Sequence, residues 1–151
     1  MGRGDLSPPC HTHSRAPWAR GFGPKPIKDA AHPWGFPWAS KEDKRKVAEA
    51  DAFVDFSIEV VELIQHMRLT TSNRTRVLLE HPEDLGAIAI GKIPASIWKL
   101  ARLRALLLME GFHTWVNRHC DFGVDVSKPT RWLSDIEELT AVGYTGWPEF
   151  R

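Results

Sequence analysis

The sequence predicts an α/β protein with an irregular N-terminal loop, and three observations support this. Residues 1–40 hold seven of the eleven prolines and three of the seven tryptophans. So many prolines exclude a long helix or a central strand from that part of the chain. From Ser40 onward, segments with helical apolar spacing alternate with short apolar runs. Helices that alternate with short buried strands are typical of layered α/β folds.

The N-terminal part, residues 1–40, is predicted to be an ordered loop rather than a disordered one. Proline-rich segments are disordered by default, but this one is unusually aromatic. Aromatic side chains bury large areas whenever they can, and we expect the tryptophans to pack the loop onto the first helix. The aromatic residues concerned are Trp18, Phe22, Trp34, Phe36 and Trp38.

A long amphipathic helix is predicted next. Ser40 is a suitable N-cap, and Glu42 and Asp43 suit the positive end of the helix dipole. Apolar residues then recur at steps of three and four as far as Met67, which gives the helix one apolar face. We expect the helix to end near Leu69, before a run of turn-forming residues.

The remaining elements are shorter. A buried strand is predicted at residues 77–79, and a second helix begins at Ser96 and is closed by Gly111. Strands follow over residues 112–116 and 131–133. We therefore divide the chain into the loop region at residues 1–40, an α/β domain at residues 41–140 and a tail at residues 141–151.

Composition limits the classes of function. The 151 residues carry a formal net charge of +1, so no overall field indicates a nucleic-acid or membrane partner. The charge is uneven, because residues 1–50 hold nine Lys/Arg against five Asp/Glu and the rest holds eleven against fourteen. No apolar run approaches the ~18 residues that span a bilayer, and no secretory signal is visible. Two cysteines make no disulfide framework, so an intracellular protein, nuclear or cytoplasmic and without a membrane partner, is expected.

Two segments carry residues suited to catalysis. Pro8 and Pro9 hold the approach to Cys10 stiffly, because each proline fixes its own φ and keeps the preceding residue extended. A cysteine needs positive charge nearby to act as a nucleophile, and Arg15, Arg20 and the neighbouring histidines could supply it. Glu80 follows the first predicted strand directly, where α/β sheets bind ligands, and could act there as a proton donor.

These segments together resemble the cytosine-5 DNA methyltransferase family. The resemblance rests on Pro8-Pro9-Cys10 followed by Ser14, then a helix, a strand ending at Glu80 and a glycine turn before a basic strand, and it extends over most of residues 5–134. It implies that Cys10 attacks C6 of a flipped-out cytosine and that Glu80 contacts the base at N3 and at its amino group. It also implies S-adenosylmethionine as methyl donor and DNA as partner.

The resemblance assigns further roles and a fold. Arg131 would support the catalytic pair as a cation. The substrate-binding residues would be Pro9, Ser14, Gly123 and Lys128. The fold would be a partial Rossmann-like methyltransferase fold, the C-terminal part of a catalytic domain. The family's cofactor-binding motifs precede its cysteine and are not recognisable upstream of Cys10, so we expect a fragment that is inactive alone and needs a complementary half-domain.

Two other functions remain open from the residues. The first is a non-catalytic nucleic-acid-binding or protein-interaction remnant, in which the tryptophans of the loop act with its basic residues: Arg15, Arg20, Lys25 and Lys28. The second is a small zinc-binding module. Its residue types suit zinc, but their spacings do not match paired-ligand steps, so no metal is expected: Cys10, His11, His13, His119 and Cys120. For Glu80 the alternative role is a surface ion pair with Arg74 or Arg76.

Overall fold

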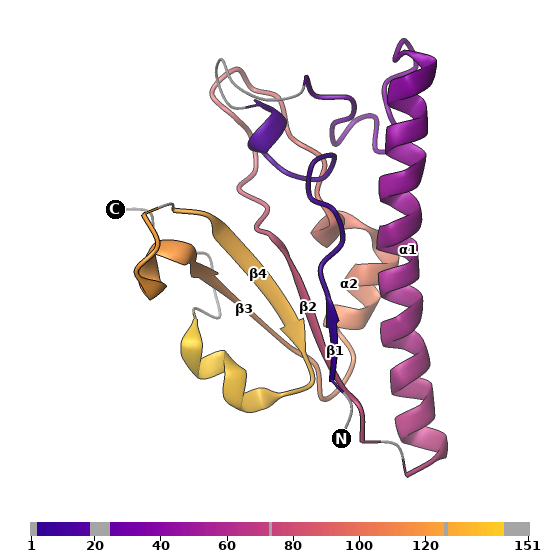
Figure 1. Ribbon diagram of the computed structural model, residues 1–151, viewed down its shortest axis with the longest axis vertical. Coiled ribbons are helices and arrows are strands. Elements are labelled where there is room, and N and C mark those ends of the chain that lie inside the picture. The colour runs from indigo at the N-terminus through magenta and orange to yellow at the C-terminus, as the bar shows by residue number, and fades with distance from the viewer. Residues whose placement is uncertain (1–2, 19–24, 73, 126, 144–151) are drawn as a thin grey trace.

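The structure is a computed structural model, and it describes residues 3–18, 25–72, 74–125 and 127–143. Arg20 and Phe22 of the predicted loop, and most of the predicted tail, lie outside the described residues. In the described part the chain forms a mixed α/β arrangement, as predicted, with one four-stranded sheet and two α-helices (Figure 1).

The sheet has the order β1-β2-β4-β3. β1 pairs parallel with β2, whereas β2 and β3 both pair antiparallel with β4. The first three strands therefore run in one direction and β4 runs against them. The antiparallel part, β2-β4-β3, leaves the expected Rossmann-like fold unconfirmed, because that fold has a mostly parallel sheet. The strands span Arg3–Leu6 (β1), Arg76–Pro82 (β2), His113–Arg118 (β3) and Pro129–Ser134 (β4).

Helix α1, Lys41–Thr70, confirms the first helix prediction. Ser40 caps it, because its Oγ accepts a hydrogen bond from the backbone N–H of Asp43 at 3.0 Å. The helix ends one residue beyond the predicted position. As the crossover between β1 and β2, α1 makes possible the parallel pairing of these two strands.

The second helix was expected to begin at Ser96 and to be closed by Gly111, and the structure contradicts both ends. Ser96 caps a short 3₁₀ turn, Ile97–Lys99, by accepting from the backbone N–H of Trp98 at 3.3 Å. Leu100 is then extended, with φ −65° and ψ 134°, so helical hydrogen bonding cannot run through it. Helix α2 begins only at Ala101 and ends at Leu107.

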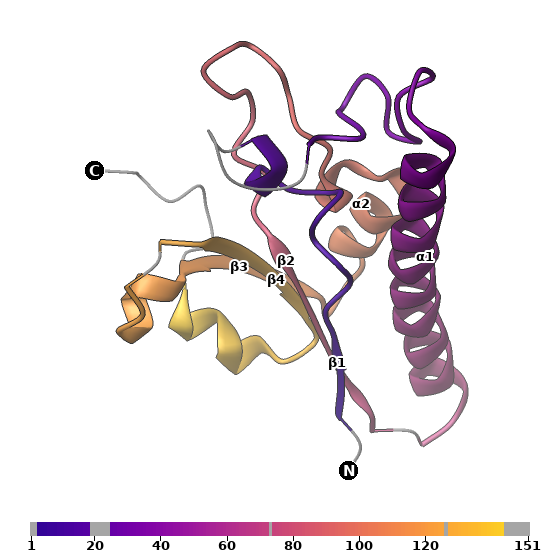
Figure 2. The ribbon, with the colours of Figure 1, turned by 45° about the horizontal axis from the view of Figure 1, so that its top comes forward.

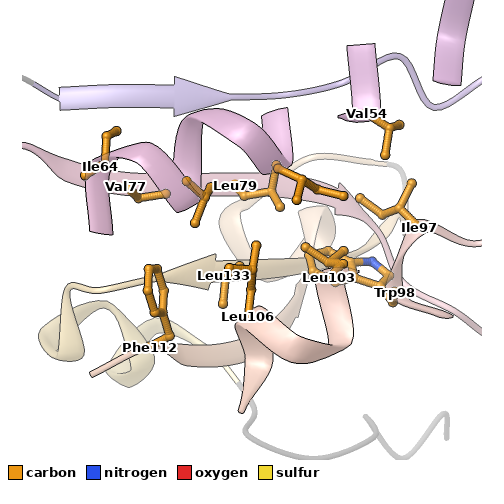
Figure 3. Packing of buried hydrophobic residues seen from close by; sticks show 12 residues of the cluster. Val54, Ile64, Val77, Leu79, Ile97, Trp98, Leu103, Leu106, Phe112 and Leu133 are labelled. Atoms are coloured by element: carbon orange, nitrogen blue, oxygen red, sulfur yellow. The ribbon is translucent and has the colours of Figure 1, made fainter. Parts of the chain in front are cut away.

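The core lies between the sheet and the two α-helices (Figure 3). The helices cover one face of the sheet, and a 3₁₀ segment at Glu137–Val142 covers part of the other (Figures 1 and 2). Alternate residues of β2 enter the core. Among the described residues, no helix has the length and apolar character needed to cross a membrane. Buried members of the core are Val54, Ile58, Val61, Val77, Leu79, Ile97, Leu103, Leu106 and Leu133.

The N-terminal loop is ordered, but the expected packing of its tryptophans is wrong for two of them. Trp34 and Trp38 are each 73% exposed. Trp38 stacks on Phe36 instead, with ring centroids 5.0 Å apart and planes 7° from parallel. A lysine instead of a tryptophan connects the loop to α1. The side chain of Lys28 is fully buried and pairs with Asp51 of the helix.

Candidate active site at the ends of β1 and β2

The parallel register of β1 and β2 brings the cysteine loop to Glu80. Leu6 pairs with Leu79, so the next residues, Ser7 and Glu80, lie side by side, Ser7 directly after the end of β1 and Glu80 two residues before the end of β2. Ser7 Oγ donates a hydrogen bond to Glu80 Oε2 at 2.8 Å. The segment Ser7-Pro8-Pro9-Cys10 therefore leaves the sheet beside Glu80, at the edge where α/β sheets bind ligands.

Glu80 uses its second carboxylate oxygen for a cation. Lys128 Nζ lies 3.2 Å from Glu80 Oε1 and donates to it. The alternative pairing with Arg74 or Arg76 is wrong, since Glu80 is engaged by Lys128 and Ser7, and Arg76 pairs with Asp135. The Glu80 side chain is 19% exposed, so its carboxylate is oriented from two sides and still reachable.

A pocket of about 420 Å³ opens at this pair. Trp132 supplies an aromatic wall, because it is in register with Glu80 and shares its face of the sheet. Its ring stacks on Trp115 at 6.3 Å, and its indole N–H has no hydrogen-bond partner among the described residues. Cys10 is not among the residues that line this pocket, which are Leu6, Ser7, Leu78, Glu80, His119, Lys128 and Trp132. A flat ring with polar edges fits such a surface, since aromatic faces favour stacking.

Cys10 is half-buried and has a free thiol. Its carbonyl accepts from the backbone N–H of His13 at 3.2 Å, which fixes a turn directly after the prolines. Ser14 is buried and serves this turn locally, because its Oγ accepts from the backbone N–H of Ala16 at 3.3 Å. The second cysteine, Cys120, is exposed and also free.

Arg131 lies on the other face of the sheet from Glu80. It is in register with His81, and its Nε donates to Glu83 Oε2 at 2.7 Å. Its Nη1 donates to Thr114 Oγ1 at 3.1 Å. Burial raises the pKa of Glu83, and the positive charge of Arg131 acts against that rise. The predicted supporting cation is thus held in a buried ion pair, and Lys128 is the cation that meets Glu80.

Gly123 shapes the loop that brings His119 and Lys128 to the pocket. It ends the 3₁₀ turn His119–Phe122 with φ +81°, a conformation that favours glycine. His119 Nε2 lies 3.2 Å from Thr130 Oγ1, and its backbone N–H donates to the Lys128 carbonyl at 3.3 Å. The loop between β3 and β4 is therefore closed on itself beside the site.

His81 lies behind the site in the core. It is fully buried, and neither ring nitrogen makes a hydrogen bond among the described residues. Burial lowers its pKa to about 4, against the opposing effect of the Glu80 carboxylate. Its ring meets those of His13 and Trp98 edge-on, at 6.2 and 6.5 Å. His81 is therefore neutral at neutral pH.

A buried polar network fixes the cysteine loop from the helix side. Lys28 Nζ donates to Asp51 Oδ1 and lies 2.7 Å from His13 Nε2. The pKa of His13 is lowered to about 2, mainly by burial and next by the positive charge of Lys28, so its ring is neutral. If Nε2 accepts from Lys28, Nδ1–H donates to Thr12 Oγ1, 3.0 Å away. Burial lowers the pKa of Lys28, and Asp51 opposes that shift.

Sequence reasoning missed Ser7, His119 and Trp132 as pocket residues, and the network of His13, Lys28 and Asp51. Only one signal was available: Ser7 directly follows the residues now seen as β1, so recognising that strand would have placed Ser7 beside Glu80. The positions of the other missed residues depend on strand register and on the path of the N-terminal loop, which the sequence pattern does not reveal.

The loop after β1 does not have the form of a nucleotide-binding turn. In doubly wound folds such a turn is rich in glycine, which lets the backbone approach the ligand closely. The loop after β1 instead begins with Ser7-Pro8-Pro9-Cys10, which is stiff and bulky. Within the described part of the chain, no group of three or more His, Cys, Asp or Glu side chains is placed to hold a metal ion. The chain matches no protein-family model, no curated protein and no solved structure.

Proposed function

We propose that this chain is the base-handling part of a cytosine-5 DNA methyltransferase-like catalytic domain. The observation that carries the proposal is the contact of Ser7, Glu80 and Lys128 at the point where the Cys10 loop leaves the sheet. Cys10 Sγ adds to C6 of a cytosine turned out of the helix. Glu80 contacts N3 and the amino group of that base, and Lys128 and Ser7 hold the carboxylate in place.

The pocket supports a flat heterocyclic substrate. Its volume of about 420 Å³ lies in the range of small-molecule sites, roughly 300–1,000 Å³. Trp132 lines the pocket with an aromatic ring, and Glu80, its register partner on the neighbouring strand, offers a carboxylate acceptor. Stacking on an aromatic side chain is the usual way of holding an unstacked base.

The strand directions support the finer fold proposal, the C-terminal part of a Rossmann-like domain. β1, β2 and β3 run the same way, α1 crosses between β1 and β2, and the candidate site lies at the carboxyl ends of β1 and β2. Ligands of doubly wound folds bind at that edge. In this proposal β4 is a single reversed strand inserted into an otherwise parallel sheet.

A second apolar face of α1 supports a complementary half-domain as partner. Phe53, Phe56 and Leu63 are 58%, 58% and 56% exposed, although they share one side of the helix with the partly buried Val60. β1, next to α1, pairs with β2 alone among the described strands. A strand and a helix from the other half would cover both features. We propose that this half holds the methyl donor, so the chain alone transfers no methyl group.

Adduct formation tests the proposal without a methyl donor. The probe is a DNA oligonucleotide in which one cytosine is replaced by 2-pyrimidinone, a base that adds thiols readily at the corresponding carbon. Addition forms one S–C bond and moves one proton to the ring, so intact-mass spectrometry should show protein plus oligonucleotide. We expect a slow adduct with the wild-type chain, and none with Cys10→Ser.

Cys120→Ser is the matched control, because Cys120 is the other free thiol and is more exposed than Cys10. It should keep the wild-type rate. An adduct on Cys120, or one that survives Cys10→Ser, would overturn the nucleophile assignment. No adduct at all with the wild-type chain would overturn the proposed base-handling site.

A second candidate function is binding of single-stranded nucleic acid by the aromatic loop. Trp34 and Trp38 are among the most exposed large side chains of the described residues. A second pocket of about 390 Å³ joins Trp38 and Phe36 to Lys25 and Lys46. Exposed aromatic rings beside lysines suit base stacking with phosphate contact. Trp38→Ala should weaken binding of a labelled oligothymidine severalfold in fluorescence anisotropy, and unchanged affinity would exclude this function.

A further inference from the structure

A separate pocket of about 250 Å³ lies between α1, the start of α2 and the N-terminal loop. Its walls are apolar: Val54 and Ile58 of α1, each 2% exposed, face Leu100 and Ala101. An apolar cavity of roughly 150 Å³ holds one benzene ring. The space therefore suits a compound of one or two fused rings.

One end of this pocket is polar. His13 and Asp51 both line it. Asp51 Oδ1 accepts from Lys28 and lies 3.3 Å from His13 Nε2, whereas Oδ2 has no hydrogen-bond partner among the described residues. An ionised carboxylate can only accept hydrogen bonds. A ligand in the pocket would therefore be favoured if it presents an N–H or O–H to Asp51.

The cations beside the pocket are both paired with carboxylates. Lys28 is paired with Asp51 at the inner end. At the rim, Arg102 Nη2 donates to Glu62 Oε2 at 2.7 Å, and its Nη1 lies 3.7 Å from Asp55 Oδ1. An anion would enter a mostly apolar space without a free counter-charge, and a cation would lose its hydration against mostly apolar walls, which is costly in both cases. The lining therefore favours an uncharged ligand.

We propose that this pocket binds an uncharged compound of one or two fused rings that donates a single ring N–H or O–H to Asp51. Trp34, which lines the pocket and is 73% exposed, offers an aromatic face at the opening. The proposal does not depend on Cys10 or Glu80, which do not line this pocket.

The test is a titration of the ¹⁵N-labelled chain with indole, a neutral two-ring compound with one N–H, followed by heteronuclear NMR. We expect saturable shifts of the amides of Val54 and Ala101, with a Kd of roughly 0.1–1 mM for a ligand of this size. Indene has the same fused rings without the N–H and should bind at least fivefold more weakly, because a hydrogen bond to a charged acceptor is lost.

Two tryptophan variants form a matched pair. Ala101 and Ala105 are both exposed on α2, but only Ala101 lines the pocket. Ala101→Trp should abolish saturable binding, whereas Ala105→Trp should leave the Kd within twofold. Trp34→Ala, at an exposed position, should weaken binding at least threefold. Absence of saturable shifts with indole, or an unchanged Kd in Ala101→Trp, would falsify the site. Equal Kd values for indene and indole would show that a hydrogen bond to Asp51 does not contribute to binding.

Discussion

Ser7 donates a hydrogen bond to Glu80 across 73 positions of the chain, with 2.8 Å between Oγ and Oε2. The contact depends on the parallel register of β1 and β2, because it joins the residues that follow the Leu6–Leu79 pair. Lys128 occupies the other carboxylate oxygen. The orientation of Glu80 is therefore set by three parts of the chain that are distant in sequence, and each of them can be removed separately.

Removal of the Lys128 cation should affect chemistry more than stability. Lys128 is 37% exposed and its partner Glu80 is 19% exposed, so the pair contributes about 0–1 kcal/mol to folding. The free energy of unfolding of Lys128→Gln, measured in urea, should therefore lie within about 1 kcal/mol of the wild-type value. The rate of adduct formation with the 2-pyrimidinone oligonucleotide should fall at least tenfold, because Glu80 loses one of the two groups that orient it.

Lys41→Gln provides the control for this variant, since Lys41 is an exposed lysine at the start of α1. It should change neither stability nor adduct rate. If Lys41→Gln and Lys128→Gln slow the reaction equally, general attraction of DNA by positive charge accounts for the effect and the specific role of Lys128 is wrong.

Removal of Arg131 should affect stability first. Its partner Glu83 has a side chain only 1% exposed, so Arg131→Gln leaves an uncompensated buried carboxylate. Such changes cost about 3–5 kcal/mol, measured as a lower free energy of unfolding in urea. The double variant Arg131→Met/Glu83→Leu should recover most of that loss, because it removes both charges. If Arg131→Gln is as stable as wild type, the ion pair does not hold this part of the sheet.

The fold was predictable where local patterns decide it. The apolar spacing of α1 and its Ser40 cap gave both ends of the helix within one residue. β1 could not be recognised as a full strand, because Arg3-Gly4-Asp5-Leu6 has no apolar alternation and is held by pairing with β2. The break at Leu100 was equally invisible, since its residue type is a good helix former.

The candidate site was predictable in part. Glu80 was found because it ends an apolar run, but its contacts with Ser7 and Lys128 follow from strand register. The side to which Arg131 points follows from the same register, which puts it beside His81 rather than Glu80. Burial of Lys28 contradicts the usual surface position of lysine and depends on Asp51, a contact of tertiary structure.

The Lys28–Asp51 pair should respond unequally to loss of either partner. The Lys28 side chain is fully buried, whereas that of Asp51 is 17% exposed. Asp51→Asn leaves the ammonium without its counter-charge in the interior, and should cost about 3 kcal/mol or more. Lys28→Met leaves Asp51 near water and should cost less. Urea unfolding of both single variants and of Lys28→Met/Asp51→Asn measures the coupling, and equal losses in the single variants would contradict the buried position of Lys28.

Stability should fall between pH 6.5 and pH 4 because of His81. Burial lowers its pKa from 6.5 to about 4 in the folded protein. In that interval the unfolded chain binds a proton at His81 that the folded chain does not bind, so the free energy of unfolding decreases as pH falls. For a shift of this size the contribution of His81 is about 3 kcal/mol, complete only near pH 4. His13, whose pKa is also lowered by burial, adds a slope of the same sign, whereas Asp51 and Glu83, whose pKa values burial raises, act in the opposite direction.

His81→Leu isolates this contribution. Among the described residues neither ring nitrogen has a hydrogen bond of good geometry. The leucine therefore loses only weak interactions with the backbone of Pro9 and Pro82, and it has nearly the same volume. At pH 7 the variant should be about as stable as wild type. At pH 5 it should be more stable by about 2 kcal/mol, since each unit below 6.5 contributes about 1.4 kcal/mol. His66→Leu, which removes an exposed histidine of α1, controls for loss of a histidine as such. Urea unfolding of the three proteins at pH 7, 6 and 5 gives the difference, and a constant gap between wild type and His81→Leu across this range would show that His81 is not desolvated in the core.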